Sequence, residues 1–158
     1  MSEKNEIILV LVATDTDIVI ARQAGRTMAA EMGFSSTEAV LVATAISELA
    51  RNIYTYASQG EITIRPMNGT GRKGIEIVAL DHGPGIPDVQ QAVQKGYSTS
   101  GGLGLGLPGV RWLMDEFAIV SRVGEGTTVT ARKWKLQDVK PRDADLGATF
   151  LASKPLPS

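Results

Sequence analysis

The N-terminal part of the chain changes from an apolar run to a helical pattern. Residues 7–13 are apolar and lie between acidic residues, which predicts a β-strand. A helix is predicted from Asp15 or Asp17, either of which could cap it, to about Met32. Its apolar positions recur near helical spacing at Ile18, Ala21, Met28 and Met32. Gly33 is then expected to end the helix.

A second, longer helix is predicted from Ser35 to about Tyr56. Ser35 and Glu38 have the spacing of a capping box, in which each side chain accepts a hydrogen bond from a backbone amide at the helix N-terminus. The apolar positions of this segment then recur as on the buried face of an amphipathic helix: Val42, Ile46, Leu49 and Ile53.

The middle of the chain has the pattern of two strands joined by a turn. Residues 61–67 alternate between apolar and polar side chains, which predicts a half-buried strand. Residues 68–74 begin with Asn-Gly and contain further glycines, which predicts a turn. Residues 75–80 are almost continuously apolar, which indicates a central strand.

The later elements complete a predicted α+β fold. A short helix is expected near residues 89–94, and Pro108 fits the first turn of a further helix that runs to about Glu116. Residues 117–122 and 127–134 alternate around Val-Gly-Glu-Gly, which predicts a β-hairpin. This order of elements indicates a two-layer α/β sandwich, with helices on one face of a mixed, mostly antiparallel sheet.

The composition limits the class of protein. The chain has 158 residues, of which 43% are hydrophobic and 21% charged, enough for one domain with a buried core. A net charge of −1 argues against a nucleic-acid surface or a polybasic membrane anchor. Cysteine is absent, which excludes disulfides and a cysteine nucleophile. A single histidine, His82, argues against a Ser-His-Asp triad.

We expect one domain over residues 1–136 and a flexible tail over residues 137–158, where the chain becomes polar and contains proline. The apolar run at residues 7–13 is too short to span a membrane, and its acidic flanks do not fit a signal peptide. A cytoplasmic protein is therefore expected.

The sequence Glu-Leu-Ala-Arg-Asn places Glu48 and Asn52 four positions apart on the second predicted helix. Residues at this spacing project from neighbouring positions, here on a side away from the apolar stripe. A carboxylate and an amide oxygen could there hold a metal ion or orient a nucleophile. The pattern also fits an ordinary solvated helix edge.

The sequence Asp-His-Gly-Pro-Gly, residues 81–85, directly follows the predicted central strand. Asp81 could accept a hydrogen bond from an amino group of a ligand, and Gly83 and Gly85 would keep side chains out of the way. The same residue types are common in plain turns. His82 is interpreted as a loop histidine.

Residues 98–109 hold five glycines in twelve positions, which fits either a linker or a backbone that closely approaches a ligand. The spacing of three glycines matches a dinucleotide-binding fingerprint: Gly104, Gly106 and Gly109. That fingerprint requires a preceding strand, and no strand is predicted before these glycines. Bare amides that lead into a helix N-terminus favour phosphate binding. The segment Gly-Glu-Gly-Thr-Thr, residues 124–128, is typical of a hairpin turn, from which a threonine hydroxyl could reach a ligand.

Together and in this order, the four motifs resemble the nucleotide-binding fold of the GHKL ATPases, the Bergerat fold. The resemblance extends over about residues 7–135. The stretches ELARNIYTYA and GLGLGLPGVRWLMDEF are most similar to the RsbT-type switch kinases of the stressosome pathway, which belong to the small serine/threonine kinases that regulate sigma factors. The resemblance implies ATP and Mg as cofactors.

The resemblance also implies a role for each motif. Glu48 would be the general base that takes the proton of a substrate hydroxyl, and Asn52 would hold the Mg ion. Asp81 would accept from the adenine amino group, with Gly83 and Gly85 beside the base. The other implied binding residues are Ser98 and Thr99 in the lid, Gly102, Gly104 and Gly106 at the phosphates, and Thr127 on the adenine side.

The implied function is phosphorylation of STAS-domain antagonist or scaffold proteins, with activation of a metal-dependent serine phosphatase downstream. Lys95 or Arg51 could neutralise phosphate charge. Two alternatives stay open: an anti-sigma factor kinase that binds a sigma factor directly, and a non-catalytic binding module controlled by its nucleotide state. No nucleic-acid or membrane partner is expected.

Overall fold

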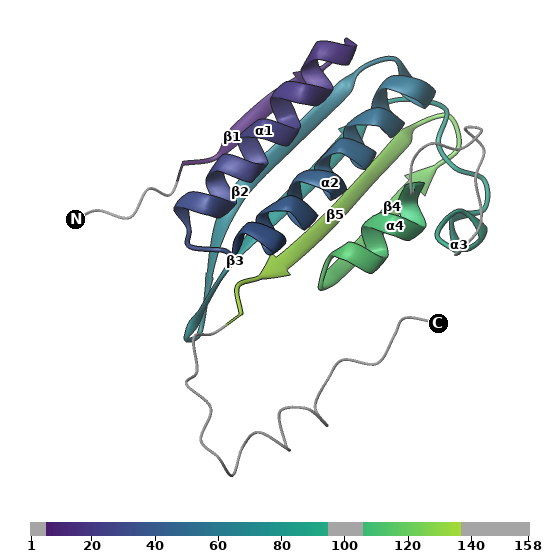
Figure 1. Ribbon diagram of the computed structural model, residues 1–158. Helices are drawn as coiled ribbons and strands as arrows, with labels where there is room; N and C mark the ends of the chain where they lie inside the picture. Colours follow the sequence, from purple (N-terminus) through teal and green to yellow (C-terminus); the bar gives the residue numbers. More distant parts are fainter. Residues whose placement is uncertain (1–5, 95–105, 137–158) are drawn as a thin grey trace.

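The computed structural model describes residues 6–94 and 106–136. Its elements are β1 (Ile8–Val12), α1 (Asp15–Glu31), α2 (Ser36–Asn52), the π-helix η1 (Ile53–Ala57), β2 (Gly60–Gly69), β3 (Arg72–Asp81), α3 (Val89–Ala92), α4 (Gly106–Leu113), β4 (Glu116–Arg122) and β5 (Gly126–Trp134). The strands form one sheet in the order β1-β2-β3-β5-β4, and each neighbouring pair is antiparallel. Helices α1, α2 and α4 cover one face of this sheet (Figure 1). The predicted two-layer α+β sandwich is confirmed.

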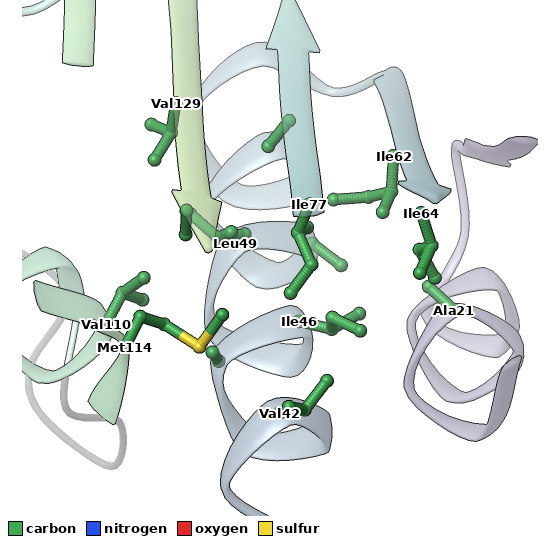
Figure 2. Packing of buried hydrophobic residues seen from close by; sticks show 14 of the residues in the cluster. Ala21, Val42, Ile46, Leu49, Ile62, Ile64, Ile77, Val110, Met114 and Val129 are labelled. Atoms are coloured by element: carbon green, nitrogen blue, oxygen red, sulfur yellow. The ribbon is translucent and has the colours of Figure 1, made fainter. Parts of the chain in front are cut away.

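The hydrophobic core lies between the helices and the sheet. The predicted stripe of the second helix is confirmed, because none of its members is more than 2% exposed: Val42, Ile46 and Leu49 on α2, and Ile53 at the start of η1. Ile46 and Leu49 lie close to side chains of the sheet, such as Ile77, and Val110 and Met114 lie on the α4 side of α2 (Figure 2). Each fully buried side chain of this size contributes about 1.5–3 kcal/mol. The packing therefore fixes α2 firmly over the sheet.

The capping of the first two helices is partly as predicted. Ser35 and Glu38 form the expected capping box, with N···O distances of 3.0 and 3.1 Å. The N-cap of α1, however, is Thr14, and the prediction of Asp15 or Asp17 was wrong. Asp17 instead lies at the third helical position, where its carboxylate accepts from the Thr14 amide at 3.0 Å while its own amide donates to the threonine hydroxyl. The two reciprocal bonds explain why the helix begins one residue after Thr14.

Several predicted boundaries differ from the observed ones. The turn predicted over residues 68–74 is confined to two residues, because the β2–β3 ladder continues through the pairs Met67–Gly74 and Asn68–Lys73 to Gly69 and Arg72. The second helix does not continue in α form to Tyr56: α2 ends at Asn52, and η1 follows it.

The fourth helix ends earlier than predicted. It begins at Gly106, so Pro108 lies in its first turn as expected, but it ends at Leu113 rather than at Glu116. Glu116 instead opens β4, where it pairs with Arg132 of β5. The cross-strand pairing thus takes residues that local helical periodicity had assigned to the helix.

In the part of the chain that the structure describes, no helix combines the length and apolar character needed to cross a membrane. The tail predicted over residues 137–158 lies outside that part.

Candidate nucleotide-binding site

One end of the sheet places two polar residues on its helix-covered face. Asp81, the last residue of β3, is paired with Thr127 near the start of β5. Alternate residues of a strand face the same side, so Asp81 shares the covered face with Ala79, and Thr127 shares it with Val129. Both apolar neighbours are at most 4% exposed, whereas Asp81 and Thr127 are half-buried. The end of the core is therefore polar and partly accessible.

The turn after β3 is held by Asp81 itself. Its Oδ1 atom accepts a hydrogen bond of 2.9 Å from the Gly83 amide. A carboxylate has about four positions at which it can accept a hydrogen bond. Because one of them is used by Gly83, Asp81 can still accept a hydrogen bond from a ligand. His82 lies exposed in the same turn, as expected for a loop histidine.

The two glycines of this motif are required by packing within the fold. A Cβ at Gly83 would lie 2.6 Å from the Cβ atom of Ala57 in η1. Gly85 has a φ of +78°, and a Cβ there would collide with the backbone of Arg122. Close packing is thus a sufficient reason for both glycines, and their predicted place beside adenine stays a prediction.

Thr127 is joined to a residue that the sequence reasoning missed. The Oγ atom of Ser121 in β4 lies 2.7 Å from Oγ1 of Thr127 and accepts a bond of 2.7 Å from the Ile86 amide. Ser121 thereby connects the loop after β3 to the β4–β5 hairpin. The sequence did contain a sign of this role. Phe117 and Ile119 are apolar residues at alternating positions of β4, and the next position of this pattern is a serine, Ser121.

Glu48 is nearly buried on α2, with 7% of its surface exposed. The alternative interpretation as a solvated helix edge was wrong for Glu48, because α4 packs against α2 and begins at this carboxylate. One carboxylate oxygen of Glu48 accepts from Arg51 at 3.0 Å. The other accepts from the backbone amide of Gly106, also at 3.0 Å. The end of the glycine-rich segment thus meets the first motif across 58 positions of sequence.

Asn52 ends α2 four residues after Glu48 and is half-buried. The π-helix η1 begins at the next residue and contacts both β2 and β3. Because Ala57 of η1 packs against Gly83, this short element connects the first motif to the turn after Asp81. π-Helical turns within helices are frequent at functional sites.

The protein residues at this end of the sheet could supply only part of the ligands that a metal ion needs. Within residues 6–94 and 106–136, no group of three or more His, Cys, Asp and Glu residues is placed to hold a metal. The amide oxygen of Asn52 is a hard donor, and Mg²⁺ commonly takes one or two protein oxygens together with phosphate oxygens and water. The donor set therefore fits a magnesium ion that arrives with a phosphorylated ligand.

Four predicted binding residues, Ser98, Thr99, Gly102 and Gly104, lie outside the described residues, as does Lys95. The described part brings the others into two groups: Glu48 with Gly106, and Asp81 with Gly83 and Thr127. Their roles toward a ligand remain predictions.

A separate surface cavity lies at the opposite end of the sheet, around the β2–β3 turn. It is lined by Asn68, Gly69, Gly71, Arg72, Lys73, Lys135 and Leu136. None of the four motifs contributes to it, so we do not assign it to the candidate site.

Comparison with known proteins gives a consistent picture. The family described as "Histidine kinase-like ATPase domain" matches residues 11–133. The serine/threonine-protein kinase RsbT of Bacillus subtilis is 54% identical over 125 residues, which cover 79% of this chain and 94% of RsbT. An anti-sigma F factor of Caldanaerobacter subterraneus is 32% identical over 120 residues, covering 72% of this chain and 82% of that protein. The RsbU and RsbW domains of Rv1364c from Mycobacterium tuberculosis share the fold, with a TM-score of 0.57 at 19% identity over 84% of this chain and 33% of that one.

Proposed function

Because the chain belongs to the family of histidine kinase-like ATPases, and within it to the RsbT-type serine/threonine kinases, we propose that it phosphorylates a STAS-domain protein at a serine or threonine. The observation that carries this proposal is the 54% identity to RsbT over 94% of the length of that kinase. The substrate would be an antagonist of an anti-sigma factor or a scaffold protein. Its phosphorylation would release the kinase to activate a metal-dependent serine phosphatase.

In the proposed reaction Glu48 acts as the general base. The substrate oxygen forms a bond to the γ-phosphorus of ATP while the bond from that phosphorus to the β–γ bridging oxygen breaks, and ADP leaves. Glu48 takes the hydroxyl proton. Its two oxygens each accept one hydrogen bond, from Arg51 and from the Gly106 amide, and so retain lone pairs for the hydroxyl. Such a base typically contributes about 10²- to 10⁴-fold in rate.

The other residues would position the nucleotide. Asp81 would accept from the adenine amino group, with Gly83 and Gly85 beside the base and Thr127 supporting it. The amide oxygen of Asn52 would hold a Mg ion, whose charge stabilises the phosphates during transfer. The remaining phosphate contacts are proposed for the lid residues and the glycine backbone: Ser98, Thr99, Gly102, Gly104 and Gly106. Positioning of this kind supplies most of the catalysis in phosphoryl transfer, because the transition state is loose.

We also propose that residues 1–136 form the kinase domain, with residues 137–158 as a tail outside it, and that the protein acts in the cytoplasm. The support is that the family match ends at residue 133.

A second candidate is an anti-sigma factor that also phosphorylates its antagonist, which the 32% identity to an anti-sigma F factor favours. The two candidates differ in their partner. Purified sigma factors retained by the immobilised protein in the presence of ATP would favour this second candidate.

The direct test is incubation with Mg-ATP and candidate STAS-domain proteins, followed by intact mass measurement of the partner. We expect an increase of one phosphate on the partner, and none when ATP is replaced by a non-hydrolysable analogue. Stable binding of ATP without transfer to any STAS partner would instead support a non-catalytic binding module.

A further inference from the structure

Arg51 lies between the two residues of the first motif, and the sequence suggested it only as one of two candidates to neutralise phosphate charge. We propose that Arg51 is a positioning residue, which holds the carboxylate of Glu48 in the orientation that accepts the substrate proton. This inference rests on the proposed function and adds a residue to it.

The contact between the two side chains is local and well formed. Nη1 of Arg51 lies 3.0 Å from Oε1 of Glu48, and the two residues are three positions apart in the last turns of α2. The Glu48 side chain is 9% exposed, whereas the Arg51 side chain is 49% exposed. Arg51 therefore reaches from the solvent-facing side of the helix toward a carboxylate that is nearly enclosed.

The orientation of Glu48 requires two donors. The last torsion of a glutamate side chain is broad and roughly two-fold, so a single bond leaves the carboxylate plane free to turn. The Gly106 amide fixes one oxygen at 3.0 Å, and Arg51 fixes the other at the same distance. With both donors in place, the remaining lone pairs keep a constant direction. Misplacement of a reacting group by about 1 Å can cost about 10²-fold in rate.

The nature of the contact predicts which substitutions should be tolerated. Only one nitrogen of the guanidinium contacts Glu48. A lysine presents a single cationic donor at the end of a flexible stem. We therefore expect lysine at position 51 to retain much of the effect, and glutamine or alanine to lose it.

The experiment compares Arg51→Ala, Arg51→Gln and Arg51→Lys with the wild type and with Arg22→Ala, a matched loss of an exposed arginine on α1. Phosphate transfer to the STAS substrate is measured at varied ATP concentrations. We expect the kcat of Arg51→Ala and Arg51→Gln to fall about 10- to 100-fold, with the KM for ATP within about two-fold. Arg51→Lys should keep at least a third of the wild-type kcat, and Arg22→Ala should match the wild type. Thermal unfolding checks each variant, and Arg51→Gln keeps the packing of the side-chain stem should Arg51→Ala be unstable.

Two results would overturn the inference. An unchanged kcat together with an unchanged KM for ATP in Arg51→Gln would remove Arg51 from the reaction. An unchanged kcat with a raised KM for ATP would make it a phosphate-binding residue instead. A positioning role further requires that Arg51→Gln add little to Glu48→Gln, because the two act as a unit. Failure of the proposed function looks different, since the wild type itself would then transfer no phosphate.

Discussion

Glu48 lies in the helix layer of this protein, where α4 meets α2, and Glu76 lies on the open face of the sheet. Both carboxylates are nearly buried, with 7% and 4% of their surfaces exposed. Their hydrogen-bond partners differ in origin. Glu76 is bonded to Arg65 on β2 at 2.5 Å and to Arg132 on β5 at 2.7 Å, both from strands that flank its own. Glu48 is bonded to a neighbour on its helix and to the amide of Gly106.

The surroundings of Glu76 form a continuous row across the sheet. Arg65, Glu76, Arg132 and Glu116 are direct cross-strand neighbours in this order, and their charges alternate. Glu116 also accepts a hydrogen bond from the indole of Trp134. Opposite charges that lie directly across from each other stabilise a sheet. The row therefore ties β2, β3, β5 and β4 together on the open face.

This difference separates a structural carboxylate from a candidate catalytic one. Both oxygens of Glu76 are bonded to guanidinium groups, which come from the two neighbouring strands of the sheet. Glu48 has one side-chain partner and one backbone amide, and that amide belongs to the end of the glycine-rich segment. Burial alone does not distinguish the two residues, but the origin of their partners does.

The largest effect is expected for Glu48→Gln. Without a basic carboxylate, phosphate transfer should fall about 10²- to 10⁴-fold, while the ATP affinity measured by calorimetry should stay within about two-fold. The matched control is Glu76→Gln, the same chemical change on the open face. Equal turnover in Glu48→Gln and wild type would remove Glu48 from the mechanism and leave both carboxylates structural.

Glu76→Gln should instead act on stability. The substitution removes the charge that lies between two arginines, of which Arg132 keeps its contact with Glu116. We expect the free energy of unfolding to fall by about 1.5–3 kcal/mol. Urea unfolding measures this fall, and the transfer rate per folded molecule should not change. A variant that lost activity but kept its stability would contradict the assignment of Glu76 to the fold.

Asp81→Asn tests the third carboxylate, at the end of the covered face. The Gly83 amide would retain the side-chain oxygen of the new asparagine, so its NH₂ group would face the adenine amino group, a donor against a donor. We expect the Kd for ATP to rise about 10- to 100-fold, the equivalent of about 1.4–2.8 kcal/mol. Unchanged affinity in calorimetry would place adenine elsewhere.

The smallest effect is the pH dependence of stability. Burial raises the pKa of Glu76, but the hydrogen bonds and charges of Arg65 and Arg132 outweigh it and hold that pKa below the ordinary value of 4.5. The hydrogen bond from Trp134 likewise lowers the pKa of Glu116, against its burial and together with Arg132.

Groups with a lowered pKa in the folded state stabilise the protein above their unfolded pKa and lose this contribution as the pH falls through the folded value. We therefore expect the free energy of unfolding to decline below about pH 4.5. Urea unfolding between pH 7 and pH 3 should show a shallower decline for Glu76→Gln. Parallel curves for the variant and the wild type would show that the row contributes little to acid sensitivity.

Most of the fold could be predicted from local patterns. The stripe of α2, the capping box at Ser35 and the β4–β5 hairpin all depend on residues that are near neighbours in sequence. The errors lie where a contact over longer distance competes with a local preference. Glu116 pairs with Arg132 in the sheet instead of extending α4, and the β2–β3 ladder continues through residues typical of a turn.

Local patterns along the chain were enough to predict which segments are helices and strands, and they marked Glu48, Asn52, Asp81 and the glycine-rich segment as candidates for chemistry. Periodicity and capping act over a few residues, which is why these features are readable along the chain. The burial of Glu48, its bond from the Gly106 amide and the contact of Ser121 with Thr127 became visible only in the folded chain. Contacts of that kind depend on strand register and on the packing of α4 against α2, which no local pattern specifies.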